Sequence, residues 1–463
     1  MPSHTTTATH KNSESSLSKF WNPATATLDM SGASLTSWPA SHSSTDAAIL
    51  KSAKVIKAPG NRFEEFPKEI LECENLRALI LDINQIASIP ASIARLKTLE
   101  SLSLDSNSRL SELPGEMAEL TNLKYLNISG NKFTRLPEFL WELEQLESLH
   151  IGGNQLDAIP PSLANLKNLK SLNLYSCKLS RLPDYIGEMT QLEELSLDFN
   201  ELTELPDFMG QLKNLWMLSV EGNKLTRLPD FIGDFKQLES LYLALNQLTE
   251  LPDAICRLDR LETLNISGNR LLRINPNIKN LKQLKRLEGH YDTFAINDCF
   301  EGLDNLRDLT LVSGEGVRPL PESLKCCKRL VRLVLRANDM RELPDWLGDM
   351  PSLYDLDVSI NNLEKLPESL GNLKKLTLLM ADHNPLKEIP WFILKMPSLA
   401  GISLHESTAA LSAEEFERFS EACGNEGIAL FTEETMGAVL SRPAYEELYA
   451  TEFQSACDEE GGI

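Results

Sequence analysis

The chain has 463 residues, 42% of them hydrophobic, and a formal net charge of −22 at pH 7. This charge excludes a general affinity for nucleic acid or anionic lipid, because phosphate groups are bound by clustered Lys and Arg. No run of about 18 apolar residues occurs, which argues against a membrane span. We therefore expect protein partners with a basic or mixed-charge surface.

The chain begins with a polar segment, residues 1–27, that is rich in Ser and Thr and lacks the apolar centre of a secretory signal peptide. We expect a disordered tail, with an export or targeting signal as the alternative. Residues 28–55 look like a degenerate N-terminal repeat or cap, in which Ala33 stands where later repeats have Asn. Within it, residues 40–50 look like an inserted loop.

From residue 56 to residue 411 one pattern recurs about every 23 residues. A clear copy is Leu195-Ser-Leu197-Asp-Phe-Asn200-Glu-Leu202-Thr-Glu-Leu205-Pro206. The alternating leucines predict a short strand with one buried face, and the Asn amide can bond the backbone where the chain turns. Proline suits the first position of a helix, so it predicts a helical return segment. The Asn position recurs at Asn61, Asn84, Asn107, Asn131, Asn154, Cys177, Asn200, Asn223, Asn246, Asn269, Asp292, Gly314, Asn338, Asn361, Asn384 and Ser407.

These copies match LxxLxLxxNxLxxLPxxI over about 80% of the chain. The chain therefore resembles the Ras-group leucine-rich repeats, which include scaffolds such as Scribble and Ras suppressor, plant relatives and several bacterial effectors. The resemblance implies an α/β horseshoe solenoid with a parallel sheet on its concave face and short helices or 3-10 turns on its convex face. It also implies protein binding, with small GTPases and phosphatases among the partners to consider.

The pattern falters between residues 275 and 319. Asn275 replaces the usual proline, Gly289 replaces a core leucine, and Asp292 and Gly314 take the Asn position. Two interpretations stay open: a kink in the solenoid, or an accommodation for a partner.

After the repeats, residues 412–431 have the spacing of a helix followed by a strand, with Ser412 as the N-cap. A terminal repeat exposes its leucines unless they are covered, so we expect a C-terminal cap. Residues 432–463 form an acidic tail.

The outward-facing positions lie six, four and two residues before each Asn position, with a further exposed position directly before it. In consecutive repeats Tyr125, His150, Tyr175 and Phe199 occupy these positions in turn, which predicts a diagonal aromatic stripe suited to protein contact. The alternative is a set of isolated exposed aromatic rings. The candidate binding surface also includes Asp198, Met217, Glu221 and Tyr242.

A second candidate region lies farther along the chain. Arg286, Asp308, Arg332 and Asp355 share one outward position in successive repeats, which predicts an alternating ladder of exposed ion pairs. The candidate binding residues here are Arg286, His290, Tyr291, Arg332 and Arg336. A surface salt network and a second docking zone are the two interpretations.

No catalytic pattern is present: there is no Walker loop, no HExxH and no GxSxG. We predict a protein that is not an enzyme, with no catalytic, cofactor or metal site. Eight cysteines without CxxC spacing favour reduced thiols in a cytosol-like compartment, with Cys177 a buried thiol. Some bacterial effectors join leucine-rich repeats to a cysteine-dependent ubiquitin ligase, but the segment after the cap, with Cys457, is too short for that domain.

Two functional hypotheses follow. The first is a monomeric, cytoplasmic scaffold for signal transduction that binds a protein on its concave face. The second is a bacterial effector that a specialised secretion system delivers into host cells, with residues 1–27 as the export signal and a host signalling protein as the partner.

Overall fold

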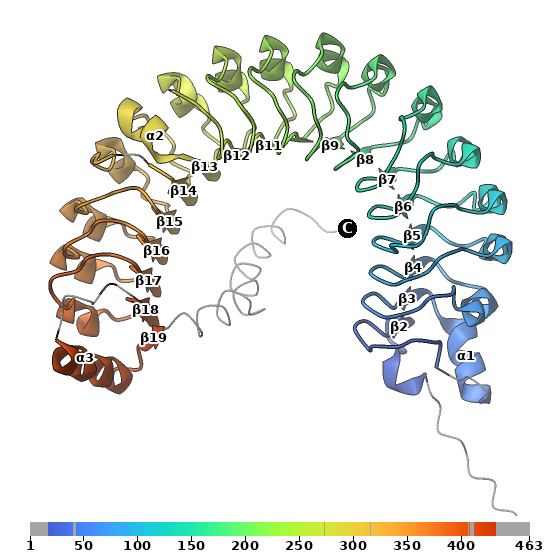
Figure 1. Ribbon diagram of the computed structural model, residues 1–463, viewed down its shortest axis with the longest axis horizontal. Coiled ribbons are helices and arrows are strands. Elements are labelled where there is room, and N and C mark those ends of the chain that lie inside the picture. The colour runs from blue at the N-terminus through green and yellow to red at the C-terminus, as the bar shows by residue number, and fades with distance from the viewer. Residues whose placement is uncertain are drawn as a thin grey trace, which may run out of the picture. The chain divides into compact units, whose positions relative to one another are not determined.

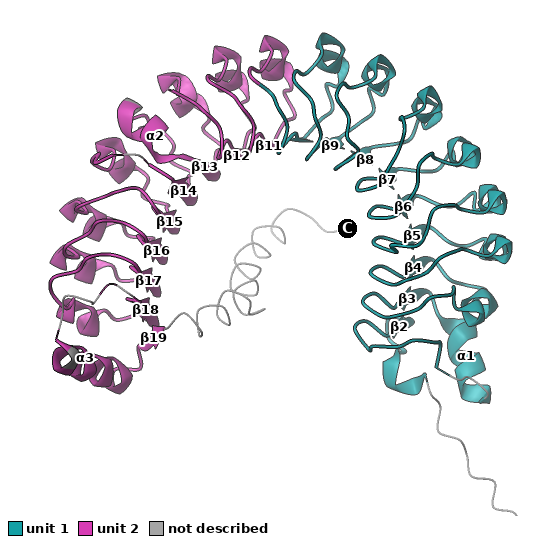
Figure 2. Ribbon diagram, viewed as in Figure 1, with its two compact units in different colours: residues 1–225 teal, residues 226–463 magenta. Residues whose placement is uncertain are grey.

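The computed structural model describes residues 17–39, 43–272, 274–314, 316–405, 407 and 412–431, apart from the side chains of Asn297 and Ala413. Most of the predicted N-terminal tail and the whole acidic tail, Cys457 included, lie outside these residues. The chain divides into two compact units, residues 1–225 and 226–463 (Figure 2).

Unit 1 is a stack of coils, each of which contributes one strand and one return segment. Strand β1 pairs antiparallel with β2, and every following strand pairs parallel with the one before it. The strands are β1 Trp21–Asn22, β2 Thr27–Asp29, β3 Val55–Lys57, β4 Ala78–Ile80, β5 Ser101–Ser103, β6 Tyr125–Asn127, β7 Ser148–His150, β8 Ser171–Asn173, β9 Glu194–Ser196 and β10 Met217–Ser219.

The return segments of unit 1 are single 3-10 turns on the edge of the coils opposite the strands (Figure 1). They are Ser18–Phe20, Lys68–Glu72, Ala91–Arg95, Gly115–Glu119, Glu138–Glu142, Pro161–Asn165, Asp184–Glu188 and Asp207–Gln211. One α-helix, α1 (Ser44–Ser52), precedes β3, with Ser43 Oγ accepting from Asp46 N at 3.0 Å. The expectation of a loop over residues 40–50 is therefore wrong from residue 44 onward.

Unit 2 repeats this plan with parallel pairing from β11 to β19. Its strands are β11 Ser240–Tyr242, β12 Thr263–Asn265, β13 Arg286–His290, β14 Asp308–Val312, β15 Arg332–Val334, β16 Asp355–Asp357, β17 Leu378–Met380, β18 Gly401–Ser403 and β19 Ala429–Phe431. Its 3-10 turns are Asp230–Asp234, Asp253–Arg257, Pro276–Asn280, Glu322–Cys326, Asp345–Asp349, Glu368–Asn372 and Trp391–Lys395. Two α-helices are added, α2 (Tyr291–Asn297) and α3 (Ala413–Asn425).

The leucines of the repeat form the core between strand and return segment. Leu195, Leu197 and Leu202 are fully buried, and each contributes about 2 kcal/mol of hydrophobic stabilisation. The proline of the repeat is not the first helical residue, as the sequence had suggested. Pro206, with extended φ and ψ of −72° and 151°, is the residue before the turn, and its carbonyl accepts from Met209 N at 3.0 Å.

Most of the Asn positions hold a buried amide, and these amides form a ladder, as predicted. Asn200 donates from Nδ2 to the carbonyls of Leu174 and Leu197, both at 2.9 Å, and its Oδ1 accepts from Cys177 N at 3.0 Å and Leu179 N at 2.9 Å. One amide thereby satisfies backbone groups of two successive coils, where unpaired polar groups would be costly. The chain therefore folds as a leucine-rich repeat solenoid.

Candidate binding surface

The ladder fixes the backbone of the residue directly before each Asn. That residue has a positive φ in most coils, and Gly or Ser occupies many of these positions, as at Gly130 and Ser176. Large apolar side chains stand there in four coils and are exposed: Ile83 (φ 52°, 61% exposed), Phe199 (52°, 50%), Leu245 (53°, 56%) and Ile360 (53°, 39%). A left-handed conformation costs a bulky residue about 1–2 kcal/mol, and an exposed side chain gains less from burial, so these residues are less favourable at this position than Gly.

Sequence reasoning found Phe199 but missed Ile83, Leu245 and Ile360. The sequence did contain a sign of these three residues. Other coils have Gly or Ser at this position, and a large apolar side chain there does not stabilise the turn. Strain of this kind is often found at functional sites.

Tyr125 and His150 lie together on the outward face of β6 and β7. Their ring centroids are 5.2 Å apart with an interplanar angle of 65°, an edge-to-face contact. His150 Nε2 is 3.1 Å from Ser148 Oγ. Burial lowers the pKa of His150, although Glu194 and Asp105 oppose the shift. Burial also raises the pKa of Tyr125.

Tyr175 and Phe199 form a second aromatic pair, which follows β8 and β9. Their centroids are 5.6 Å apart at 75°, and Tyr175 is 43% exposed. The Phe199 ring covers Gly222 of the next coil, where a Cβ would meet Phe199 Cδ1 at 2.7 Å. The predicted stripe is thus resolved into two edge-to-face pairs on the outward face of unit 1.

Acidic side chains border these pairs. Glu194 accepts from Ser171 Oγ at 2.9 Å. Asp198 accepts from Ser196 Oγ at 2.9 Å and from Glu221 N at 2.8 Å, so it links two coils as well as carrying charge. Met217 lies beside Glu194 in the strand register and is half-buried, as is Glu221. Tyr242, on β11 of unit 2, is also half-buried.

The charged residues predicted for unit 2 do form a ladder in strand register. Arg286 Nη2 is 3.6 Å from Asp308 Oδ2, and Arg332 Nε is 3.3 Å from Asp355 Oδ2. The carboxylates are not exposed as expected, since the Asp308 and Asp355 side chains are only 15% and 3% accessible. Burial raises the pKa of Asp308, with the neighbouring arginines opposing the shift.

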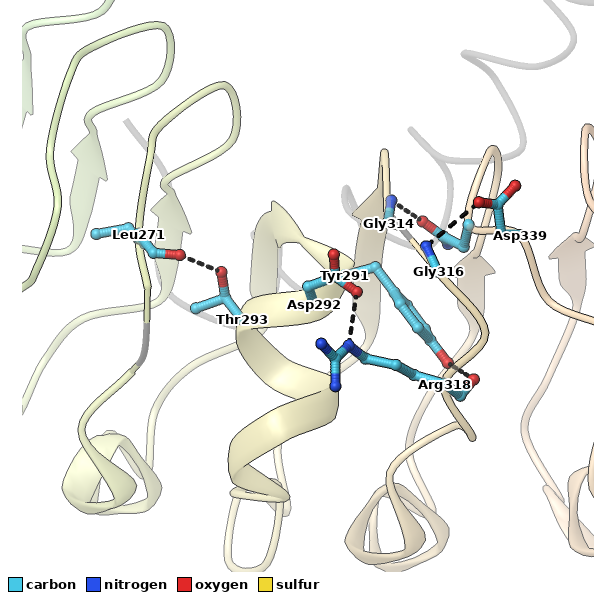
Figure 3. Close-up of polar contacts among 9 residues, drawn as sticks. Leu271, Tyr291, Asp292, Thr293, Gly314, Gly316, Arg318 and Asp339 are labelled. Carbon is cyan, nitrogen blue, oxygen red and sulfur yellow. Dashed lines mark hydrogen bonds and ion pairs between the residues drawn. The ribbon is translucent and has the colours of Figure 1, made fainter.

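Tyr291 is fully buried, so its predicted place on the exposed surface is wrong. It begins helix α2, which replaces the usual turn, and its hydroxyl donates to the Arg318 carbonyl at 3.1 Å (Figure 3). In the same close-up, Arg318 Nε lies 3.2 Å from Asp292 Oδ1, and Thr293 Oγ1 donates to the Leu271 carbonyl at 3.0 Å. Asp292 is therefore a helix residue and not a ladder residue.

Helix α2 also explains the glycines of the irregular segment. A Cβ at Gly314 would meet Tyr291 Cδ1 at 2.8 Å, and a Cβ at Gly289 would meet Phe294 Cε2 at 2.7 Å. Both glycines make room for rings that fill the core in place of leucine. His290, directly before α2, is half-buried, and Arg336, which follows β15, is exposed.

The described residues offer little for metal or redox chemistry. No group of three or more His, Cys, Asp or Glu among them could hold a metal ion, and the cysteines described form no disulfide. Cys177 is buried, which raises its pKa to about 12 and makes it a poor nucleophile. No helix in the described part of the chain is long and apolar enough to cross a membrane.

Comparison with known proteins agrees with this geometry. Residues 115–220 match a model for a leucine-rich repeat region, and residues 74–133 and 213–271 match a leucine-rich repeat model. Together the matched residues, 74–271, are similar to leucine-rich repeats. A comparison with curated proteins gives no match.

Solved structures with this repeat fold are similar over most of the chain. A leucine-rich repeat protein of Leptospira interrogans is 29% identical with a TM-score of 0.61, covering 89% of this chain and 97% of its own. A plant peptide hormone receptor, solved with the peptide RGF2, is 27% identical with a TM-score of 0.54, covering 80% and 61%. The ectodomain of an Arabidopsis thaliana receptor kinase, solved with Casparian strip integrity factor 2, is 26% identical with a TM-score of 0.51, covering 78% and 51%.

Proposed function

We propose that the outward sheet face of unit 1 binds a protein through a basic, extended segment of that partner. The observation that carries this proposal is the composition of the outward positions on β4 to β10. They hold the two aromatic pairs and five carboxylates, yet no Lys or Arg. The carboxylates are Asp82, Asp105, Glu194, Asp198 and Glu221.

Each part of this face has a role in such binding. Tyr and Phe rings provide large contact areas at low cost in side-chain entropy, and they attract cations over their faces. The surrounding Ser and Asn side chains can bond a peptide backbone, and the carboxylates favour Lys or Arg on the partner. Two plant receptors with a similar fold were solved in complex with their ligands, which supports a ligand-binding role for the repeats.

The proposal names a chemistry and not a protein. A basic segment of a host signalling protein, a small GTPase or a phosphatase would meet the same requirements. The cytoplasmic location, the alternative of export into host cells and the monomeric state stay predictions.

A random peptide library selected on the immobilised full chain tests the proposal. We expect the enriched peptides to be basic and to lose roughly tenfold or more in affinity for the variant Tyr175→Ala/Phe199→Ala, as is typical of aromatic hot spots. The matched control is Leu272→Ala, which removes a side chain that is 76% exposed on unit 2. Enriched peptides that bind the double variant as tightly as the wild type would show that this face is not the site.

A further inference from the structure

The carboxylates on the outward face of unit 1 lie in two groups, one at each end of that face. The position two residues before Asn is acidic and half-buried after β4, β5, β9 and β10: Asp82, Asp105, Asp198 and Glu221. After β6, β7 and β8 the same position holds an uncharged residue: Ser129, Gly152 and Tyr175. The negative charge of the face is therefore divided by three neutral coils.

The first group, Asp82 and Asp105, lies beside the Tyr125–His150 pair. Asp82 Oδ1 accepts from Asp105 N at 2.9 Å, so the two residues are direct neighbours across coils. Burial raises the pKa of Asp82, hydrogen bonds from Ser103 and the Asp105 backbone oppose the shift, and the charge of Asp105 adds to it. Burial and the charges of Asp82 and Asp105 also raise the pKa of Tyr125. A cation bound here would relieve the repulsion between the carboxylates and could contact the Tyr125 ring.

The second group, Asp198, Glu221 and Glu194, lies beside the Tyr175–Phe199 pair. Asp198 Oδ1 accepts from Glu221 N at 2.8 Å, which is the same bond that joins the first group. Phe199 directly follows Asp198, and its ring is 50% exposed. Each end of the face thus combines an aromatic pair with neighbouring carboxylates, and each end can hold one cation of a partner.

The strand register gives the distance between the two groups. Strands β5 to β9 pair in parallel without a gap, so Asp105 and Asp198 are four strand spacings apart. At about 4.8 Å for each spacing, the separation is about 19 Å. An extended chain advances about 3.3 Å per residue, so about six residues cover this distance, and residues i and i+6 of such a chain point to the same side.

We propose that the unit 1 face selects its partner by the spacing of two cations. Its ligand is an extended segment with two Lys or Arg residues about six positions apart, one bound by each acidic group, and uncharged residues between them. This inference rests on the function proposed above and adds where the basic residues of the segment lie. The neutral coils of Ser129 and Gly152 hold its middle part.

Two synthetic peptides of equal length and composition test this spacing. One has Lys at positions i and i+6, the other has Lys at i and i+2, and the remaining residues are Ser, Thr and Val, of which Thr and Val favour an extended chain. Isothermal titration calorimetry at low salt measures the affinity of each for the full chain. We expect the widely spaced peptide to bind roughly tenfold tighter, because it alone matches both acidic groups.

A double variant removes the first acidic group without changing its shape. In Asp82→Asn/Asp105→Asn the amide oxygen at position 82 can still accept from the backbone N–H at position 105. We expect the two peptides to bind this variant equally. The matched control is Asp157→Asn/Asp184→Asn, which removes two exposed carboxylates of unit 1 that lie beyond the sheet, and it should retain the tenfold preference.

Three results would contradict the inference. Equal binding of both peptides to the wild type would overturn it and leave the proposed function intact, because both peptides are basic. A preference that persists in Asp82→Asn/Asp105→Asn would show that the first group does not bind the second cation. Absence of binding by either peptide would overturn the inference and the proposed function together.

Discussion

Strands β6 to β9 of unit 1 and β15 to β18 of unit 2 are built on the same coil but present different outward faces. Asn361 makes the same bonds as Asn200: Nδ2 donates to Leu335 O at 2.8 Å and Val358 O at 2.9 Å, and Oδ1 accepts from Asn338 N at 3.1 Å and Met340 N at 3.0 Å. On unit 1 this frame carries paired, accessible aromatic rings, whereas on unit 2 it carries buried acidic and aliphatic side chains. The repeat determines the backbone, and the positions that the repeat leaves free determine what each face can bind.

The largest loss of stability should come from removing an Asn side chain of the ladder, which both units share. Asn200→Ala and Asn361→Ala each delete five hydrogen bonds and leave buried backbone groups unpaired, so we expect each to lower the free energy of unfolding by about 3–4 kcal/mol. Urea denaturation followed by circular dichroism measures both losses. The substitution Ser176→Ala, beside the ladder in unit 1, is the control and should change little. Strongly unequal losses in the two units would mean that the coils are not equivalent.

Removing one charge should lower stability less, and the loss should be larger for a buried ion pair in unit 2 than for an exposed pair in unit 1. Arg332→Met removes a partner of the buried Asp355, so we expect a loss of about 1–3 kcal/mol, reduced from the value for fully buried pairs because Arg332 is 35% exposed. In unit 1, Glu201 and Lys224 form a pair at 2.9 Å with both side chains about half exposed, so Glu201→Gln should cost much less than Arg332→Met. Thermal unfolding of both variants gives the comparison. Equal, small losses would show that the outward face of β16 does not isolate Asp355 from solvent.

The sequence predicts the regular coils well because each coil contributes the same side chains to the same contacts. Leu195, Leu197 and Asn200 were assigned their places from spacing alone, and Ser412 caps α3 as expected, accepting from Glu415 N at 3.2 Å. Periodicity fails where the period is interrupted. Tyr291 was predicted to be exposed because the next residue, Asp292, was assigned to the Asn position, but both residues belong to helix α2. The glycine at the Asn position of the following repeat, Gly314, was a sign that a large side chain, here Tyr291, packs against it.

The burial of the outward-facing Met380 could not be predicted by the same reasoning. Alternation in a strand tells which side a residue such as Met380 faces, but it does not tell whether another segment lies on that side. The backbone conformation of the turn likewise cannot be predicted from the spacing of the leucines. It is seen only in the structure, where Phe199 has a φ of 52°.

The smallest effect on stability, combined with a large effect on binding, should come from Phe199→Gly. Glycine relieves the left-handed strain but loses the ring contacts with Tyr175 and Gly222, so we expect the free energy of unfolding to change by less than about 1 kcal/mol. Affinity for a selected basic peptide, measured by isothermal titration calorimetry, should fall roughly tenfold. Leu245→Gly is the matched change on unit 2, because Leu245 has a φ of 53° and covers Gly268 in the same way. It should alter stability as little and leave the affinity unchanged; equal weakening by both variants would contradict a site confined to the unit 1 face.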